Sequence, residues 1–134
     1  MPNNKKKCKI KIVAYNDSNA KVGSYVSGVP FTIEVVKLTS PNGGVPVAPG
    51  DTLVEWVTNE TVRPVSAVQL FYTVDGGATW KQMVGSPVSG NPESFPWTVP
   101  SVTKKKCKVK VVLKDDKGKS VGSDTSDTFF SIQP

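Results

Sequence analysis

Residues 104–132 read KKKCKVKVVLKDDKGKSVGSDTSDTFFSI, and this stretch decides the fold class. Its first eight residues alternate, with Lys104, Lys106, Lys108 and Lys110 at one parity and Lys105, Cys107, Val109 and Val111 at the other. Successive side chains of a strand point to opposite faces, so the pattern predicts a strand with a lysine face and a mostly apolar face. Asp115–Gly118 predicts a turn, followed by a returning strand that ends at Phe129–Ile132.

The same stretch occurs twice. Residues 5–33 read KKKCKIKIVAYNDSNAKVGSYVSGVPFTI and align without a gap at an offset of 99, with 14 of 29 positions identical. Here the lysine face holds Lys5, Lys7, Lys9 and Lys11, and the opposite parity holds Lys6, Cys8, Ile10 and Ile12. Residues 16–19 predict the matching turn. The match predicts that both segments form the same β-hairpin.

A period near 99 residues suits one β-sandwich domain. Five further short strands are predicted between the copies, at residues 35–39, 52–58, 65–74, 79–84 and 95–99, separated by turn signals rich in Gly and Pro. We therefore expect residues 35–134 to form a complete antiparallel β-sandwich and residues 1–34 to be a β-hairpin duplicated from the end of a preceding repeat. A single domain that duplicated one hairpin for local use is the alternative. Prolines at 96 and 100 make residues 95–99 an edge or irregular strand.

Composition excludes several kinds of chemistry. The 134 residues include no His and two Cys, so His-activated nucleophiles, His metal ligands and a four-ligand zinc site are all absent. The acidic residues are scattered over turns and strand ends rather than paired as glycoside hydrolysis needs. We expect no enzyme activity, no metal and no cofactor.

The net charge of +6 is unevenly distributed. Residues 1–21 carry six Lys against Asp17, residues 104–134 carry eight Lys against four Asp, and the segment between them is slightly acidic. The excess of positive charge therefore belongs to the duplicated hairpin. No apolar run follows the Lys-rich start, so no signal peptide is expected, and no stretch is apolar enough for a membrane span.

Two motifs carry a resemblance to a known family. Residues 40–56, SPNGGVPVAPGDTLVEW, and 67–80, AVQLFYTVDGGATW, resemble immunoglobulin-like or fibronectin type III-like surface repeats of bacterial and archaeal secreted proteins. Those repeats are similar to the extracellular domain of fungal cell-wall glucan-assembly proteins. The resemblance implies an immunoglobulin/fibronectin type III-like sandwich in a secreted or cell-surface protein. One departure is Val47, where an aromatic residue usually follows SPNGG.

Five residues are assigned structural roles: Trp56, Asp75, Gly76, Gly77 and Trp80. Residues 73–80 also resemble the Asp-box of sialidase-type propellers, in which an Asp caps a hairpin turn. A propeller needs this box in each blade and the chain has one, so the box predicts the same turn in a sandwich. Trp56 is expected in the core. Trp97, between prolines, is the tryptophan we expect to be exposed, as part of a sugar-stacking platform if one exists.

The sequence leaves two functions open. The first is a non-catalytic structural or adhesive repeat module. The second is a binding module for an anionic polymer, such as acidic polysaccharide or nucleic acid, through a lysine face made of Lys5, Lys7, Lys9, Lys11, Lys104, Lys106, Lys108 and Lys110. A solvated face that protects an edge strand is the plain interpretation of the same residues.

The duplicated hairpin also predicts partners. The apolar parity of residues 5–33 would have no domain of its own, and a lone hairpin is marginal in water. It is expected to pack onto residues 35–134, onto neighbouring repeats of the same or another chain, or into a strand-swapped or hairpin-mediated homo-oligomer. Cys8 and Cys107 hold equivalent positions and would pair only if the two hairpins lay side by side.

Overall fold

The computed structural model describes residues 5–134, and every regular element in this range is a β-strand. The first four strands are β1 (Lys5–Cys8), β2 (Lys11–Tyr15), β3 (Lys21–Val26) and β4 (Phe31–Ile33). The remaining nine are β5 (Val36–Ser40), β6 (Gly50–Thr58), β7 (Ala67–Thr73), β8 (Lys81–Gln82), β9 (Val88–Ser89), β10 (Ser94–Val99), β11 (Lys104–Lys114), β12 (Ser120–Thr125) and β13 (Phe130–Ile132). No helix of the described chain is long and apolar enough to cross a membrane.

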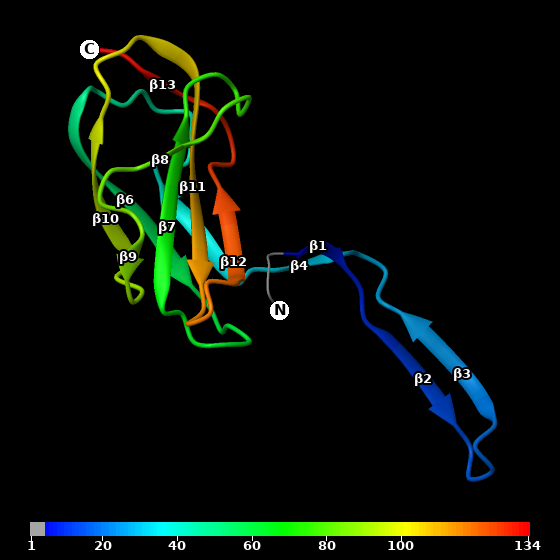
Figure 1. Cartoon of the computed structure of the whole chain (residues 1–134). Helices are drawn as coiled ribbons and strands as arrows, with labels where there is room; N and C mark the ends of the chain where they lie inside the picture. Colours follow the sequence, from blue (N-terminus) through cyan, green and yellow to red (C-terminus); the bar gives the residue numbers. More distant parts are fainter. Residues whose placement is uncertain (1–4) are drawn as a thin grey trace.

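Strands β5 to β13 form two antiparallel sheets that face each other (Figure 1). The smaller sheet has the order β10-β6-β5, so β10 lies at an edge, as the prolines predicted. The larger sheet has the order β12-β11-β7-β8, with β9 paired to β7 and β13 paired to β11. The predicted fold class is confirmed: an antiparallel sandwich of the immunoglobulin/fibronectin type III-like kind, with a separate N-terminal hairpin.

The core lies between the sheets and follows the period-two pattern of the strands. In β6, Val54 and Trp56 are buried while Leu53 and Val57 on the other face are half exposed. In β11, Cys107, Val109, Val111 and Leu113 are fully buried and face the buried side chains of β6 and β10 across the sandwich. Alternation in the sequence therefore places the core correctly in the long strands.

Trp97 is buried, which contradicts the expectation from the sequence. The residue was expected to be exposed, but it is 4% exposed and contacts Tyr72 and Phe130, with ring centroids 5.4 and 6.5 Å apart. The physical reason is parity: in β10 the side chains of Phe95, Trp97 and Val99 point inward, while those of Pro96 and Thr98 point to solvent. The prolines mark an edge strand without turning the tryptophan outward.

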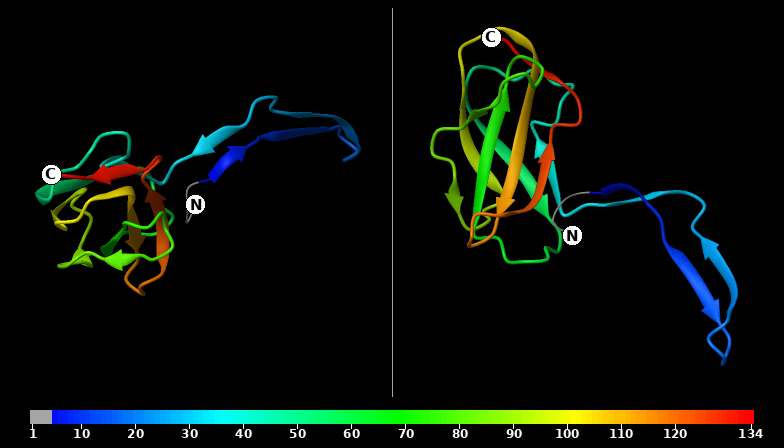
Figure 2. Two further views of the ribbon diagram at one scale, coloured as in Figure 1. Left: turned by 90° about the horizontal axis from the view of Figure 1, so that it is seen from above. Right: turned by 45° about the vertical axis from the view of Figure 1, so that its right-hand side comes forward.

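Residues 5–33 form an arm that extends away from the sandwich (Figures 1 and 2). Strand β1 pairs with β4, and β2 pairs with β3, so the arm is a long hairpin interrupted near residues 9–10 and 27–30. Most of its large apolar side chains are exposed, and the arm does not pack its apolar face onto residues 35–134 as one alternative expected. The division into segments 1–34 and 35–134 stays a prediction, and residues 1–4 of the first segment lie outside the described residues.

Candidate functional site: the lysine faces

Four lysines of β11, Lys104, Lys106, Lys108 and Lys110, lie on the outer face of the larger sheet. Lys104 and Lys106 are exposed, whereas Lys108 and Lys110 are half-buried. The Lys108 ammonium lies 5.0 Å from the centre of the Phe129 ring, and the Lys110 ammonium lies 5.2 Å from Phe71 and 4.4 Å from Trp80. A cation over an aromatic ring is attracted by the ring's negative face. Two of the four cations are therefore held against the sheet, and their stems cover its aromatic side chains.

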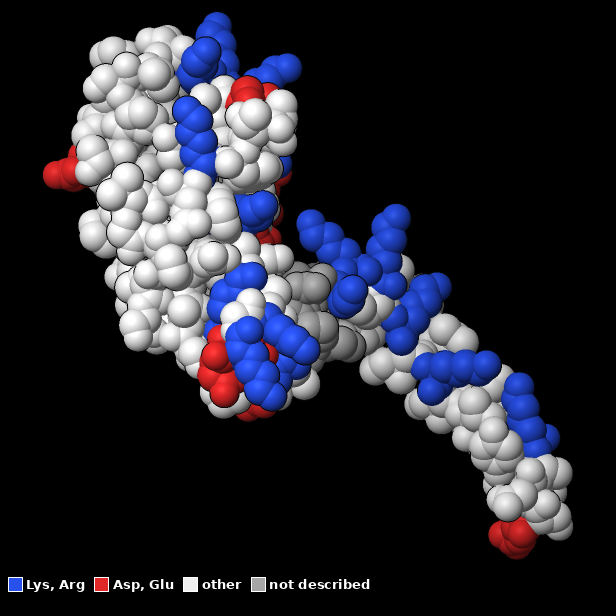
Figure 3. Space-filling model, viewed as in Figure 1, with Lys and Arg blue, Asp and Glu red and all other residues white. Residues whose placement is uncertain are grey.

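The lysines of the arm are more open. Lys5, Lys7, Lys9 and Lys11 are all exposed, and Figure 3 shows basic side chains along much of the arm with acidic atoms gathered at its tip. The alternation expected over residues 5–12 is interrupted, because β1 ends at Cys8, β2 begins at Lys11 and Lys7 has a φ of 60°. In the second copy, β11 is continuous and pairs with β7 along Lys108–Lys114. In the arm, no strand equivalent to β7 pairs with β2, so nothing holds β1 and β2 in one continuous strand.

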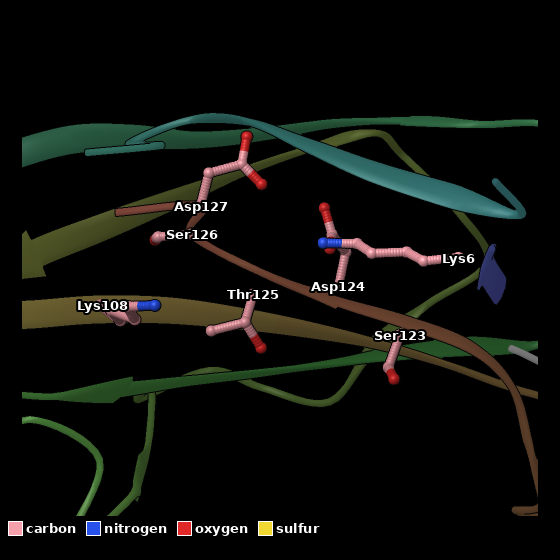
Figure 4. Close-up of a pocket in the computed structure, with 7 residues that line it drawn as sticks. All are labelled: Lys6, Lys108, Ser123, Asp124, Thr125, Ser126 and Asp127. Carbon is pink, nitrogen blue, oxygen red and sulfur yellow. The ribbon is translucent and has the colours of Figure 1, made fainter. Parts of the chain in front are cut away.

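A hollow of about 300 Å³ lies where the arm meets the sandwich (Figure 4). It is lined by Lys6, Lys108 and residues 123–127, and Figure 4 shows the Lys6 side chain extending toward Asp124. Lys6 shares the parity of Cys8, Ile10 and Ile12, and its side chain is exposed. Asp124 accepts a hydrogen bond from the Leu38 amide at 2.8 Å, and burial raises the pKa of its carboxyl. Because Asp124 and Asp127 balance the two lysines, this hollow is a poor place for a polyanion.

The turn after β7 is built around Asp75. Its Oδ1 accepts hydrogen bonds from the Thr73 hydroxyl at 2.7 Å and from the Thr79 amide at 2.9 Å. The Thr79 hydroxyl also donates to this carboxylate, and together these bonds hold the pKa of Asp75 far below its ordinary value. The Gly76 amide donates to the Lys106 carbonyl at 2.9 Å, and Gly77 packs near Trp80. The turn therefore attaches the β7–β8 connection to the lysine strand β11.

This geometry predicts a pH-dependent effect of Asp75→Asn. An amide cannot accept all the bonds that the carboxylate accepts, so the variant should melt at a lower temperature near pH 7. A depressed native pKa stabilises the fold above the unfolded value of about 4, and this contribution fades as the pH falls below it. The gap in melting temperature should therefore narrow in acid, whereas Asp116→Asn, at an exposed turn position, should change little. An equal gap in melting temperature between the native protein and the variant, near pH 7 and in acid below the unfolded pKa, would contradict the role of the carboxylate.

The tryptophans do not form a common exposed platform. Trp56 is buried and its Nε1 donates to Asn91 Oδ1 at 2.9 Å, Trp97 is buried, and Trp80 is half-buried under Lys110. Cys107 is buried, which raises the pKa of its thiol, and Cys8 is a separate free thiol in the arm. No group of three or more Cys, Asp or Glu side chains within residues 5–134 could hold a metal ion.

Two polar contacts escaped sequence reasoning because their partners are far apart in the chain. Arg63 Nε donates to Asp115 Oδ2 at 2.7 Å, which joins the β6–β7 loop to the turn before β12. Asn42 exchanges two hydrogen bonds of 2.8 Å with Asp127, one through each group of its amide. The SPNGG motif marks the second contact, but nothing local to it indicates a partner 85 residues away.

No protein-family model and no curated protein matches this sequence. Among solved structures, an engineered protein is similar at 19% identity and a TM-score of 0.48 over 75% of this chain, which spans 20% of that protein. The fibronectin(III)-like modules of Clostridium thermocellum CbhA are similar at 16% identity and a TM-score of 0.46, over 74% of this chain and 99% of theirs. Both TM-scores lie below 0.5, so the fold assignment rests on the strand order described above.

Proposed function

We propose that the chain is a non-catalytic structural or adhesive repeat module of a surface or secreted protein. The supporting observation is the duplication: the arm and the closing strands of the sandwich share both a sequence and a strand register at an offset of 99 residues. Self-similarity at a fixed, domain-length period is the sequence signature of a repeat array. The SPNGG and DGGATW motifs add the resemblance to surface repeats.

The location is tested in the organism that makes the protein. An antibody raised against residues 35–134 should label intact cells or detect the protein in the culture medium. The matched control is an antibody against an abundant internal protein, which should label only permeabilised cells. Labelling by the first antibody only after permeabilisation would overturn the proposal.

A second candidate is binding of an anionic polymer, and the exposed lysines of the arm favour it. The chain should be retained on heparin at low salt, because Lys9 and Lys11 are exposed on the arm. Lys9→Gln with Lys11→Gln should elute at clearly lower salt than Lys108→Gln with Lys110→Gln, since the latter two ammonium groups already lie over aromatic rings.

Lys117→Gln with Lys119→Gln removes the same charge from the turn before β12 and serves as the control. Equal shifts in all three double variants would mean that only net charge matters. Absence of retention at low salt would exclude the second candidate.

A further inference from the structure

The arm has the same strand register as the closing hairpin of the sandwich. Lys5 pairs with Ile33 and Cys8 with Phe31, as Lys104 pairs with Ile132 and Cys107 with Phe130. The β2–β3 pairs, from Lys11↔Val26 to Tyr15↔Lys21, correspond in the same way to the β11–β12 pairs, from Lys110↔Thr125 to Lys114↔Ser120. Both copies have irregularities at the same two places. The arm thus has the conformation of a hairpin that closes a sandwich.

Local hydrogen bonds repeat as well. The Ile10 amide donates to Ser27 Oγ at 3.0 Å, and the Val109 amide donates to Ser126 Oγ at 2.9 Å. In the turns, Asn16 Oδ1 accepts from two backbone amides, as Asp115 Oδ1 does. These bonds lie within each hairpin, so they explain how the arm holds its shape without explaining which surface it fits.

The two hairpins differ in the burial of their apolar side chains. Val109 and Val111 are fully buried by the rest of the sandwich, whereas Ile10 and Ile12 are 58% and 64% exposed. The arm nevertheless keeps the β-branched residues, Cys8, Phe31 and Ile33 at the positions that are core in the second copy. An arm selected only for solvent exposure has no physical reason to keep this apolar face.

Gly23 gives an independent indication of a missing partner. Its equivalent, Gly122, lies against the first residues of the smaller sheet, and a Cβ built there would be 2.8 Å from Val35 Cγ1. A larger residue at 122 would therefore force the Val35 side chain to move. Around Gly23 nothing lies within 4 Å of such a Cβ. The arm therefore keeps a glycine suited to close packing at a place where no packing occurs in the isolated chain.

Exchange with a second copy does not supply this partner. Each chain has one six-stranded body, residues 35–103, and two hairpins that fit it, so inserting one hairpin always releases the other. The arm would also lose three contacts of the native hairpin, because Asn16, Tyr25 and Gly28 stand where Asp115, Asp124 and Asp127 bind Arg63, the Leu38 amide and Asn42. A homo-oligomer by hairpin exchange therefore gains no burial.

We propose that the arm is a donor hairpin: it completes a partner sandwich whose six-stranded body lacks closing strands of its own. The apolar face made of Cys8, Ile10, Ile12, Phe31 and Ile33 would form half of that core, and Gly23 would receive the first strand of the partner's smaller sheet. This inference deepens the proposed role as a repeat module and rests on it. Its test measures folding of the arm rather than cellular location, so failure of the donor hairpin can be distinguished from failure of the proposed function.

The test attaches a second copy of residues 35–103 directly before Lys5, because Lys5 aligns with Lys104, the residue that follows the body within the chain. The appended body should fold onto the arm, and the amides of Ile10 and Ile12 should exchange at least about 100-fold more slowly than in the unmodified chain. The control fusion carries Ile10→Asp with Ile12→Asp, which should leave the appended body unfolded while residues 35–134 stay folded.

A second fusion carries Asn16→Asp, Tyr25→Asp and Gly28→Asp, which restore the partners of Arg63, the Leu38 amide and Asn42, and it should resist urea better than the first. In the chain itself the same body is completed by residues 104–132, so it has the sequence to fold once a closing hairpin is present. The proposal is therefore overturned if the arm amides stay unprotected both in the first fusion and in the fusion that carries the three Asp substitutions. It is equally overturned if the unmodified chain is a dimer in solution with its arm amides already protected, since a second copy would then be the partner.

Discussion

Trp56→Ala is expected to lower the free energy of unfolding by about 3–5 kcal/mol, a large part of the total stability of a domain of this size. Trp56 is 2% exposed in the central strand of the smaller sheet and packs against both sheets. Its indole also donates to Asn91, which in turn donates to Thr58 Oγ1 at 2.9 Å. Alanine leaves a cavity and removes the partner that fixes the β9–β10 loop.

The measurement is urea denaturation followed by far-UV circular dichroism, which reports the loss of strand structure and does not rely on tryptophan fluorescence. Leu53→Ala is the matched control, because Leu53 lies in the same strand on the opposite face and is 51% exposed. Its cost should stay below about 1 kcal/mol. Similar losses for the two variants would contradict the assignment of Trp56 to the core.

The core of the long strands could be predicted from the sequence because alternation has a single physical meaning in a two-layer fold. Val109 and Val111 on one side and Lys108 and Lys110 on the other face the way their parity indicates. Trp97 was misplaced because local composition was given more weight than parity. Pro96 does mark an edge strand, but an edge strand of a sandwich still has one face directed toward the core.

The environment of the lysines could not be predicted, because it depends on contacts between distant strands. Lys110 and Trp80 are 30 residues apart in the chain, and only the β11–β7–β8 pairing brings the ammonium over the ring. The strands β7 and β8, which give Lys110 its aromatic neighbours, have no counterpart beside Lys11, because β2 pairs only with β3. Two identical sequence positions thus have different surroundings, and the repeat alone could not distinguish them.

In the arm, too, the local sequence determines the conformation of the hairpin but not its tertiary surroundings. Its sequence specifies the hairpin register fully, because turn residues and local hydrogen bonds suffice for that. Its sequence also specifies an apolar face, but which surface covers Ile10 and Ile12 is not encoded within residues 5–33. A local pattern determines the conformation of a hairpin, and the tertiary partner determines whether that conformation is stable.

The SPNGG motif owes its form to contacts with the connection between β12 and β13. The Gly44 amide donates to the Phe129 carbonyl at 3.1 Å, and the Ser126 hydroxyl donates to the Pro41 carbonyl at 2.9 Å. With the Asn42–Asp127 pair, these bonds attach the start of the β5–β6 loop to the closing hairpin. The motif therefore joins the two sheets at one end of the sandwich.

Gly43→Ala should destabilise the sandwich by about 2–5 kcal/mol, because two costs combine. Gly43 has a φ of 111°, and a Cβ there would lie 2.1 Å from Thr128 Oγ1 and 2.4 Å from the Thr128 carbonyl oxygen. A left-handed conformation costs alanine about 1–2 kcal/mol, and overpacking adds about 1–3 kcal/mol. Gly44 also has a positive φ, 79°, but nothing lies within 4 Å of a Cβ built there, so Gly44→Ala should carry only the conformational cost.

Thr128→Ala should rescue the Gly43→Ala variant only in part, because the clash with the Thr128 carbonyl oxygen remains. Equal urea midpoints for the two glycine variants would show that Thr128 does not constrain the loop.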